Sequence, residues 1–374
     1  MLERIIENQL LKLKKSNKVI LLFGSRRVGK TRLIESLSKR LKEKTLFLNG
    51  EDQEVQEIFQ RRTIANLKNI SGENKILIID EAQAIPEIGK ALKLMIDTQD
   101  ELTIYATGSS SLDLMNQSGE PLTGRLHIFQ LFPMAQMELK QNILEARQNL
   151  DERLLYGSYP EVFGLDGLEA KTSYLLQLVQ SYLLKDILAY SGIRHSEKIF
   201  ALLRLIAFQT GMQVSYTELG KQLGLNKATV ETYLDILSKV FILYKLPAYS
   251  SNPRKEVSKS AKWYFIDNGI RNALINDFRP LSMRNDQGQL WESYILSERI
   301  KKLRYTKSNA QLYFWRSYQQ QEIDLVELHN GELHAYEIKY NEAKKFKAPS
   351  GFRQLYPKVQ VEKIDKQNYL DFIV

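Results

Sequence analysis

A glycine-containing segment between an apolar run and a helix-like stretch constrains this chain more than any other feature. Residues 24–31 read GSRRVGKT and match the pattern G-x-x-x-x-G-K-[ST]. The apolar run Val19–Phe23 precedes the segment, and a helix is expected to begin near Lys30. A strand, a loop and a helix in this order predict a phosphate-binding loop, because backbone N–H groups of the loop and of the helix N-terminus can surround an anion.

The pattern also predicts a role for the polar residues of the loop. Lys30 is expected to reach the β and γ phosphates of ATP, and Thr31 to bind Mg²⁺. A turn that binds no nucleotide is the alternative. The predicted ATP-binding residues of the loop are Gly24, Ser25, Arg26, Arg27, Val28, Gly29, Lys30 and Thr31.

A second apolar run, Ile76–Ile79, ends in two carboxylates. Asp80 is expected to hold Mg²⁺ through water, and Glu81 to polarise the attacking water. Consecutive strand residues point to opposite faces of a sheet, so one of the two acids could instead be a surface charge. An acid that activates water favours hydrolysis of ATP over transfer of a phosphoryl group to a second substrate.

Two further places in the sequence are candidates for the same site. The run Leu102–Ala106 leads to small hydroxyl residues, and Ser109 or Ser110 could contact the γ-phosphate or the lytic water. A loop that caps the next helix is the alternative reading. Arg125 is a candidate catalytic residue, as an arginine finger or a γ-phosphate sensor, although a surface arginine fits the same sequence. The sequence leaves open whether it acts in its own chain or in a neighbouring one.

Strand-like runs that alternate with helix-like segments predict an α/β fold with a parallel sheet and helices on both faces. A chain of 374 residues is too long for a single hydrophobic core, so several domains are expected. The predicted domains are a P-loop ATPase domain at 1–140, a helical lid or linker at 141–196, a winged helix at 197–280 and a C-terminal α/β domain at 281–374.

Composition excludes several classes of protein. The chain has no cysteine, which excludes disulfides, a thiolate zinc site and a cysteine nucleophile. The N-terminal segment has no secretory pattern, and no apolar run reaches the roughly 20 residues that span a bilayer, so a cytoplasmic protein without a membrane partner is expected. The formal net charge of +9 suits an anionic partner such as a nucleotide or nucleic acid. An oligomer is compatible with the sequence, which does not decide it.

Residues 214–234 read as a helix, a short turn and a second helix, and Tyr249–Asp267 as a hairpin. Together they predict a winged helix, a fold that binds either DNA or protein. If it binds DNA, the exposed face of the second helix and the basic hairpin would make the contacts. The candidate DNA contacts are Lys227, Thr229, Thr232, Arg254, Lys255 and Lys259.

Four charged residues near the C-terminus form a second candidate site. Glu292 lies on a predicted helix, Asp324 on one predicted strand, and Glu337 and Lys339 on one face of the next. This set is similar to the restriction-endonuclease-like fold, which implies carboxylates that hold Mg²⁺ and a lysine that activates water. A cross-strand ladder of salt bridges without catalytic activity is the alternative.

Several of these motifs together resemble one family. GSRRVGKT, ILIIDEAQ, ATGSSS, LTGR and the later segment GSYPE are similar to those of the archaeal- and bacterial-type AAA-like ATPases. The resemblance implies an AAA+ core that binds ATP with Mg²⁺, a winged-helix module and a nuclease-like C-terminal fold. The expected function is an ATPase that hydrolyses ATP with Mg²⁺ and acts on nucleic acid through its winged-helix and nuclease-like domains. The alternative is a nucleotide-dependent signalling or scaffold switch whose C-terminal domains bind protein and are inactive.

Overall fold

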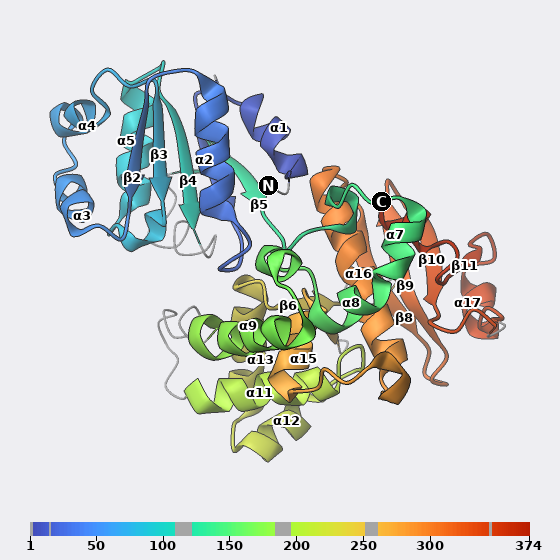
Figure 1. Cartoon of the computed structure of the whole chain (residues 1–374). Helices are drawn as coiled ribbons and strands as arrows, with labels where there is room; N and C mark the ends of the chain where they lie inside the picture. The colour runs from blue at the N-terminus through green and yellow to red at the C-terminus, as the bar shows by residue number, and fades with distance from the viewer. Residues whose placement is uncertain (1–2, 15, 109–121, 184–195, 251–260, 344–345) are drawn as a thin grey trace. The chain divides into compact units, whose positions relative to one another are not determined.

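The computed structural model describes residues 3–14, 16–108, 122–183, 196–250, 261–343 and 346–374. The chain forms two compact units (Figure 1). The first contains Met1–Phe132 and Lys239–Phe241, and the second contains Pro133–Ser238 and Ile242–Val374. Among the described residues, no helix combines the length and the apolar character needed to cross a membrane.

The first unit is built on a five-stranded sheet with the order β2-β3-β4-β1-β5, in which all neighbours are parallel. Its strands are β1 (Val19–Phe23), β2 (Thr45–Asn49), β3 (Ile76–Asp80), β4 (Thr103–Gly108) and β5 (Leu126–Gln130). Every residue of β1, β3 and β4 is buried, as expected for strands covered by helices on both faces. The predicted α/β class with a parallel-sheet core is confirmed.

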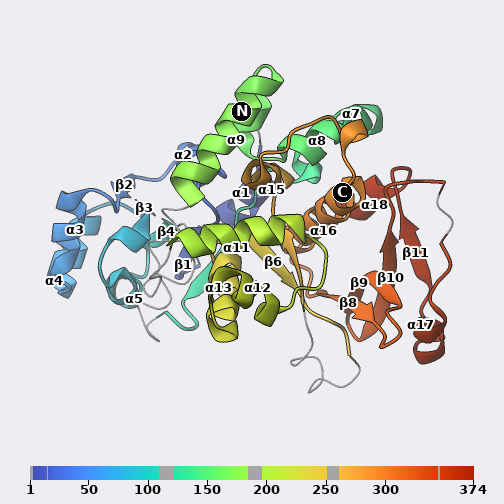
Figure 2. The same ribbon diagram turned by 90° about the horizontal axis from the view of Figure 1, so that it is seen from below.

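Helices cover both faces of this sheet (Figures 1 and 2). Leu21 of β1 and Leu77 of β3 belong to the same apolar cluster as Met95 of α5, whereas Tyr105 of β4 donates from its hydroxyl to the carbonyl of Leu10 in α1. The helices of the unit are α1 (Ile5–Leu11), α2 (Lys30–Leu41), α3 (Gln53–Gln60), α4 (Ile64–Ser71) and α5 (Ile88–Thr98), with a short 3-10 turn η1 (Ala82–Ala84).

The second unit begins with helices. They are α7 (Ile143–Gln148), α8 (Leu150–Tyr156), α9 (Leu168–Leu178), α11 (Ser196–Phe208), α12 (Tyr216–Leu223), α13 (Lys227–Lys239) and α15 (Asn268–Ile275), with short turns η2 (Gln136–Glu138), η3 (Pro160–Gly164), η4 (Val179–Leu183) and η5 (Leu281–Met283). The predicted helix-turn-helix is α12 and α13. Ser215 caps the first helix, and Gly224, in the left-handed region at φ 61°, ends it. A Cβ atom on Gly220 would lie 2.5 Å from the carbonyl oxygen of Leu225, so the turn requires glycine there.

The hairpin of this unit differs from its predicted extent. Strand β6 (Leu243–Leu246) pairs antiparallel with β7 (Lys262–Phe265), so the first strand precedes Tyr249 instead of starting there. In β6 only the first and last residues are buried, whereas all four residues of β7 are buried. The pairing partner therefore comes from the chain directly after α13, and residues 251–260 lie outside the described part of the chain.

The C-terminal part of the second unit contains a four-stranded sheet with the order β11-β10-β9-β8. Strands β8, β9 and β10 are antiparallel neighbours, and β11 is parallel to β10. The elements are α16 (Gln287–Tyr305), β8 (Gln311–Arg316), β9 (Glu322–His329), β10 (Glu332–Ile338), α17 (Ser350–Leu355), β11 (Val361–Ile364) and α18 (Tyr369–Ile373). Glu292 lies on α16, Asp324 on β9 and Glu337 on β10, as expected, and Lys339 follows directly after β10.

Candidate ATP site and C-terminal acid cluster

The glycine-containing loop leaves β1 and enters α2 in a conformation that depends on its glycines. A Cβ atom on Gly24 would lie 2.2 Å from the carbonyl oxygen of Leu131. Gly29 precedes α2 with φ 96°, in the left-handed region that favours glycine. Lys30 is 4% exposed, and its ammonium donates to the carbonyl oxygens of Gly24 at 2.9 Å and Ser25 at 3.2 Å. The loop thus folds around the ammonium group expected to reach the phosphates.

Strand order brings the predicted acid to this loop. Asp80 ends β3, and its two carboxylate oxygens accept hydrogen bonds from one helix and one neighbouring strand. The hydroxyl of Thr31 in α2 donates to Oδ2 at 2.8 Å, and that of Thr107 in β4 donates to Oδ1. The backbone N–H of Glu81 donates to Thr107 Oγ1 at 3.0 Å. Thr107 therefore links both acids, a role that the sequence analysis missed because β4 is distant from them in the chain.

The predicted water-activating acid lies in a tight turn after β3. Glu81 has φ 47°, in the left-handed region, and its carboxylate accepts a hydrogen bond from the Gln83 side chain. Gly50 packs directly against this turn, because a Cβ atom there would lie 2.4 Å from the carbonyl oxygen of Glu81. The N–H of Gly50 donates to the carbonyl of Asp80 at 2.8 Å. Close approach of two backbones holds the turn, and Gly50 was not predicted.

The structure does not bring the remaining candidates of this site together. Ser109 and Ser110 lie outside the described residues. Arg125 precedes β5, and its carbonyl accepts from the N–H of Val19, at the start of β1. The loop that contains Lys30 follows the other end of β1, so about 15 Å of strand separates the two places. The side chain of Arg125 instead pairs with Asp97 of α5, with Nε 2.6 Å from Oδ1. A role in a neighbouring chain stays a prediction.

These contacts fit ATP with Mg²⁺. The hydroxyl of Thr31 and the carboxylate of Asp80 are already paired, and both are oxygen ligands of the kind that Mg²⁺ prefers. Lys30 and the backbone N–H groups of the loop stand where phosphate oxygens would need positive partners. The residues that the sequence predicted for nucleotide and metal therefore lie at one edge of the sheet, and their roles there remain predictions.

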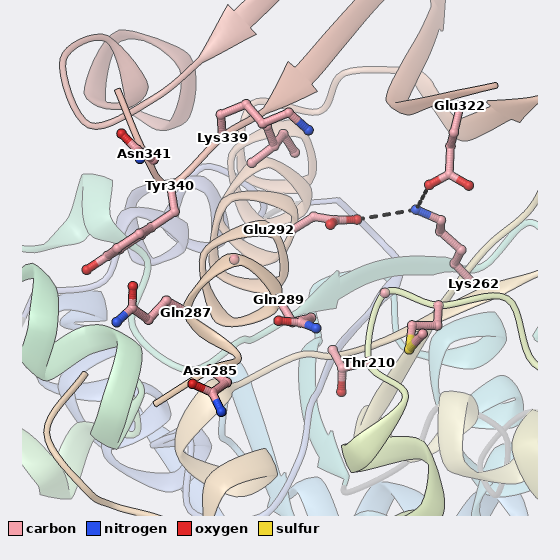
Figure 3. Close-up of a pocket in the computed structure, with 14 residues that line it drawn as sticks. Thr210, Lys262, Asn285, Gln287, Gln289, Glu292, Glu322, Lys339, Tyr340 and Asn341 are labelled. Atoms are coloured by element: carbon pink, nitrogen blue, oxygen red, sulfur yellow. Dashed lines mark hydrogen bonds and ion pairs between the residues drawn. The ribbon is translucent and has the colours of Figure 1, made fainter. Parts of the chain in front are cut away.

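In the second unit, the structure brings the predicted C-terminal charges together. The ammonium of Lys339 lies 2.5 Å from Glu337 Oε1 and 3.6 Å from Asp324 Oδ2. Asp324 also accepts from the N–H of Ile338 at 2.9 Å. Glu292 faces the same cluster from α16, alongside Lys339 (Figure 3). Four residues from one helix and two strands thus meet, in the arrangement that the sequence predicted.

Three further residues complete this cluster, and the sequence analysis did not single them out. The ammonium of Lys262, in β7, lies 2.6 Å from Glu322 Oε1 and 3.4 Å from Glu292 Oε1 (Figure 3). The hydroxyl of Tyr264 donates to Glu292 Oε1 at 2.5 Å. Lys262 and Tyr264 belong to the hairpin, far from the C-terminal strands in sequence. We call the seven residues Lys262, Tyr264, Glu292, Glu322, Asp324, Glu337 and Lys339 the acid–lysine cluster.

Burial governs the electrostatics of the cluster. Burial raises the pKa of Glu337 to about 7, assisted by the nearby charge of Asp324, while Lys339 opposes the rise. Burial likewise raises the pKa of Glu292, against the influence of Lys262. For Lys262, burial favours the neutral form, but the carboxylates of Glu292 and Glu322 outweigh it and raise its pKa. For Lys339, too, the carboxylates of Asp324 and Glu337 outweigh burial and raise its pKa. The surroundings therefore favour the charged form of both lysines and the protonated form of Glu292 and Glu337.

The cluster does not have the geometry of a metal site. Within the described residues, no group of three or more His, Asp or Glu side chains is arranged to hold a metal ion. The ammonium groups of Lys262 and Lys339 take the positions between the carboxylates. The Mg²⁺ expected for a nuclease-like site therefore does not fit, because lysine ammonium groups lie where the metal ion would be bound.

A cavity of about 470 Å³ adjoins the cluster. Glu292, Glu322, Lys262 and Lys339 line one part of it, and neutral polar side chains, among them that of Gln289, line another (Figure 3). The cavity gives solvent and polar ligands access to the edge of the cluster.

The candidate DNA-binding helix has a mixed surface. Lys227 is exposed, but Glu231 and Asp235 are exposed on the same helix, four and eight residues further on. The side chain of Asn226 caps the helix, because its Oδ1 accepts from the backbone N–H of Thr229 at 2.7 Å, and the hydroxyl of Thr229 donates to the same oxygen at 2.9 Å. Arg254, Lys255 and Lys259 lie outside the described residues, whereas Thr232 is exposed and donates to the carbonyl of Ala228.

The parallel sheet, with a phosphate loop after β1 and an acid after β3, defines the fold of a P-loop ATPase. Family comparison agrees, because residues 16–140 match the AAA domain. Residues 147–281 match a domain of unknown function, DUF8612, and residues 287–370 match another, DUF4143. The first unit is therefore an AAA-type P-loop ATPase domain, which supports ATP binding and hydrolysis.

Comparison over most of the chain finds several similar proteins. An uncharacterized protein of Mycobacterium tuberculosis is 27% identical over 325 residues, which cover 86% of this chain and 70% of that protein. An uncharacterized protein of Haemophilus influenzae is 26% identical over 291 residues, 71% of this chain and 72% of that protein. A Walker-type ATPase of Pyrococcus abyssi is similar in structure, with a TM-score of 0.50 and 15% identity, over 74% of this chain and 96% of that one. That similarity supports the fold.

Proposed function

We propose that the first unit binds ATP with Mg²⁺ and hydrolyses it. The observation that carries this proposal is the network around Asp80, whose carboxylate accepts from Thr31 and Thr107 and so connects the phosphate loop to the turn containing Glu81. Thr31 and Asp80 would hold Mg²⁺, which supplies positive charge to the β and γ phosphate oxygens when bound. Lys30 would bind the same phosphates from within the loop.

Glu81 would act as the base in this reaction. It follows Asp80 directly, at the carboxyl edge of the parallel sheet where ligands of such sheets bind. Its side chain is oriented by Gln83, and its backbone by Thr107 and Gly50. A carboxylate held in this way can accept a proton from the water that attacks the γ-phosphorus, while the bond from that phosphorus to the β–γ bridging oxygen breaks and ADP leaves. Hydrolysis, rather than transfer to a second substrate, is what this acid supports.

We further propose that the nucleotide state controls binding of a partner by the α12–α13 pair and its hairpin, a winged-helix arrangement. Two partner classes follow from the observations. The net charge of +9 supports nucleic acid. The exposed face of α13 favours protein, because Glu231 lies one helical turn from Lys227 and would weaken its attraction for phosphates. We therefore favour a nucleotide-dependent switch that binds protein.

Nuclease activity is not part of this proposal. The acid–lysine cluster matches the order and types of residues in the restriction-endonuclease-like fold. Its carboxylates are nevertheless engaged by two lysines, and no metal-binding group of three exists among the described residues.

Steady-state ATP hydrolysis with Mg²⁺ tests both parts of the proposal. The full-length protein is assayed at low salt without DNA, with duplex DNA and with single-stranded DNA, and Lys30→Ala serves as the blank. Hydrolysis that is lost in the blank and does not change with DNA is expected. No difference between the natural protein and the blank would contradict the ATPase assignment.

DNA would become the partner if it stimulated hydrolysis and the stimulation faded as salt was added, since phosphate contacts release counterions. Lys227→Ala should then weaken the stimulation, whereas Lys221→Ala on α12 serves as a matched control with the same loss of charge.

A further inference from the structure

Lys262 is a buried charge that two carboxylates of the second unit surround. It begins β7 and is 2% exposed, although lysine is rarely buried without partners. Its ammonium lies between Glu322 of β9 and Glu292 of α16, at 2.6 Å and 3.4 Å. The ring of Phe314 closes a third side, with its centroid 5.4 Å away. The ammonium therefore joins the hairpin to both the helix and the sheet of the C-terminal part.

Each lysine of the cluster lies between two carboxylates. Lys339 contacts Asp324 and Glu337, and Lys262 contacts Glu292 and Glu322, so each ammonium serves two carboxylates. Buried carboxylates need a cation, a proton or donated hydrogen bonds, because burial otherwise favours their neutral form. Here the two lysines, Tyr264 and the N–H of Ile338 supply such partners, and Arg316 lies 3.5 Å from Glu322 Oε2, whereas Glu337 Oε2 is buried without a hydrogen-bond partner.

We propose that the ammonium of Lys262 occupies the place of a cation beside Glu292 in the acid–lysine cluster and excludes a divalent metal ion from that carboxylate. A metal ion bound by Glu292 would add two positive charges beside an ammonium that already lies within salt-bridge distance of the same carboxylate, and the two cations would repel each other. Lys262 also links the hairpin to the C-terminal sheet, because it is a residue of β7 and its ammonium pairs with Glu322 of β9. A bound metal ion is not covalently attached to the hairpin and would not make this link by itself.

This assignment is independent of ATP hydrolysis and concerns the second unit alone. It explains why carboxylates in the order of a metal-dependent nuclease lack a metal-binding geometry. It also gives a structural role to the ion pair of Lys262 and Glu322, two residues that have no part in the proposed ATP hydrolysis. Through the ion pair of Lys262 with Glu322, the cluster links the hairpin to the C-terminal sheet.

Mn²⁺ binding and thermal unfolding of the full-length protein test this inference. Nucleotide is left out, and all proteins contain Asp80→Asn to weaken metal binding in the first unit. Free Mn²⁺ is counted by electron paramagnetic resonance, and melting temperatures are measured with and without Mn²⁺. The otherwise natural protein should show no Mn²⁺ binding that depends on Glu292, so adding Glu292→Gln should change nothing in the Mn²⁺ count.

Lys262→Met should behave differently. Without metal its melting temperature should fall, since Glu292 and Glu322 lose their buried partner. Mn²⁺ should then bind at an additional site and raise the melting temperature, and Glu292→Gln in the same protein should abolish both effects. Lys245→Met is the matched control, because Lys245 is an exposed lysine on the other strand of the hairpin, and it should gain no Mn²⁺ site.

Two results would overturn the inference. One is Mn²⁺ bound by the protein with Lys262 in place and lost with Glu292→Gln, which would show that metal and lysine coexist. The other is a folded Lys262→Met protein that gains no Mn²⁺ site. If Lys262→Met does not fold, the comparison of the Lys262-containing protein with and without Glu292→Gln still decides: equal Mn²⁺ binding supports exclusion, and a loss contradicts it.

Discussion

The candidate ATP site and the acid–lysine cluster are both built from charged and hydroxyl side chains, but they are assembled differently. In the ATP site, Lys30 and Thr31 are the first two residues of α2, directly after the loop, and Asp80 and Glu81 are consecutive at the end of β3. The cluster joins side chains from β7, α16, β9 and β10. A site made from contiguous segments depends on a few local patterns, whereas a site made from scattered side chains depends on the whole unit.

The largest effect is expected at the contiguous site. Replacing Glu81 by Gln removes the proposed base but keeps the size of the side chain, so steady-state ATP hydrolysis should fall about 10²- to 10⁴-fold. Binding of a fluorescent ATP analogue should be retained. Glu87→Gln is the control, because Glu87 pairs on the surface with Arg62 and Lys90, and it should hydrolyse ATP normally. An unchanged rate in Glu81→Gln would exclude this residue as the base.

The next effect tests the connection that the tertiary structure makes between the two acids. Thr107→Val keeps the shape of the side chain but removes the donor to Asp80 and the acceptor for the Glu81 N–H. The first unit should lose about 1–3 kcal/mol of stability, because buried polar groups lose their partner, and hydrolysis should fall. Thermal unfolding and the hydrolysis assay check this, with Thr107→Ser as the variant that keeps the hydroxyl. Equal behaviour of valine and serine would argue against the connection.

A smaller effect is expected from protonation in the cluster. Because the pKa of Glu337 is raised to about 7 in the folded protein, the folded state binds more protons than the unfolded state between pH 4.5 and 7. Stability should therefore decrease as pH rises through this window, by at most about 1.4 kcal/mol per pH unit, and level off above it.

Unfolding of the second unit, followed at several pH values, measures this slope. Glu337→Gln should reduce it, and Glu332→Gln, an exposed acid at the start of the same strand, should leave it unchanged. A slope of the opposite sign in this window would contradict the raised pKa.

The smallest effect is expected at Arg125. Its ion pair with Asp97 is about two-fifths exposed, so Arg125→Ala should change stability by less than about 1 kcal/mol. Hydrolysis at low protein concentration should stay normal, because Arg125 lies at the N-terminal ends of β1 and β5, whereas the phosphate loop follows the C-terminal end of β1. Asp97→Asn should give the same result. Loss of hydrolysis confined to Arg125→Ala at high protein concentration would instead identify a role in a neighbouring chain.

Much of the first unit could be predicted from the sequence. Apolar runs such as Val19–Phe23 and Ile76–Ile79 are buried on both faces, and such strands leave a strong local signal. The loop and the two acids follow those runs directly. The hairpin was predicted with the wrong first strand, because β6 is only four residues long and follows α13 closely, which weakens the local pattern that would reveal it.

The sequence by itself determined the phosphate loop, the acid pair and the presence of four charged candidates near the C-terminus, because each depends on residue types at short spacing. Only the tertiary structure decided that β4 lies between β1 and β3, which brings Thr107 to Asp80. It also decided that Arg125 lies at the N-terminal end of β1, away from the phosphate loop. It alone placed Lys262 among the carboxylates. The physical reason is that strand order and the packing of a hairpin against a sheet are set by contacts between residues far apart in the chain, which no local pattern records.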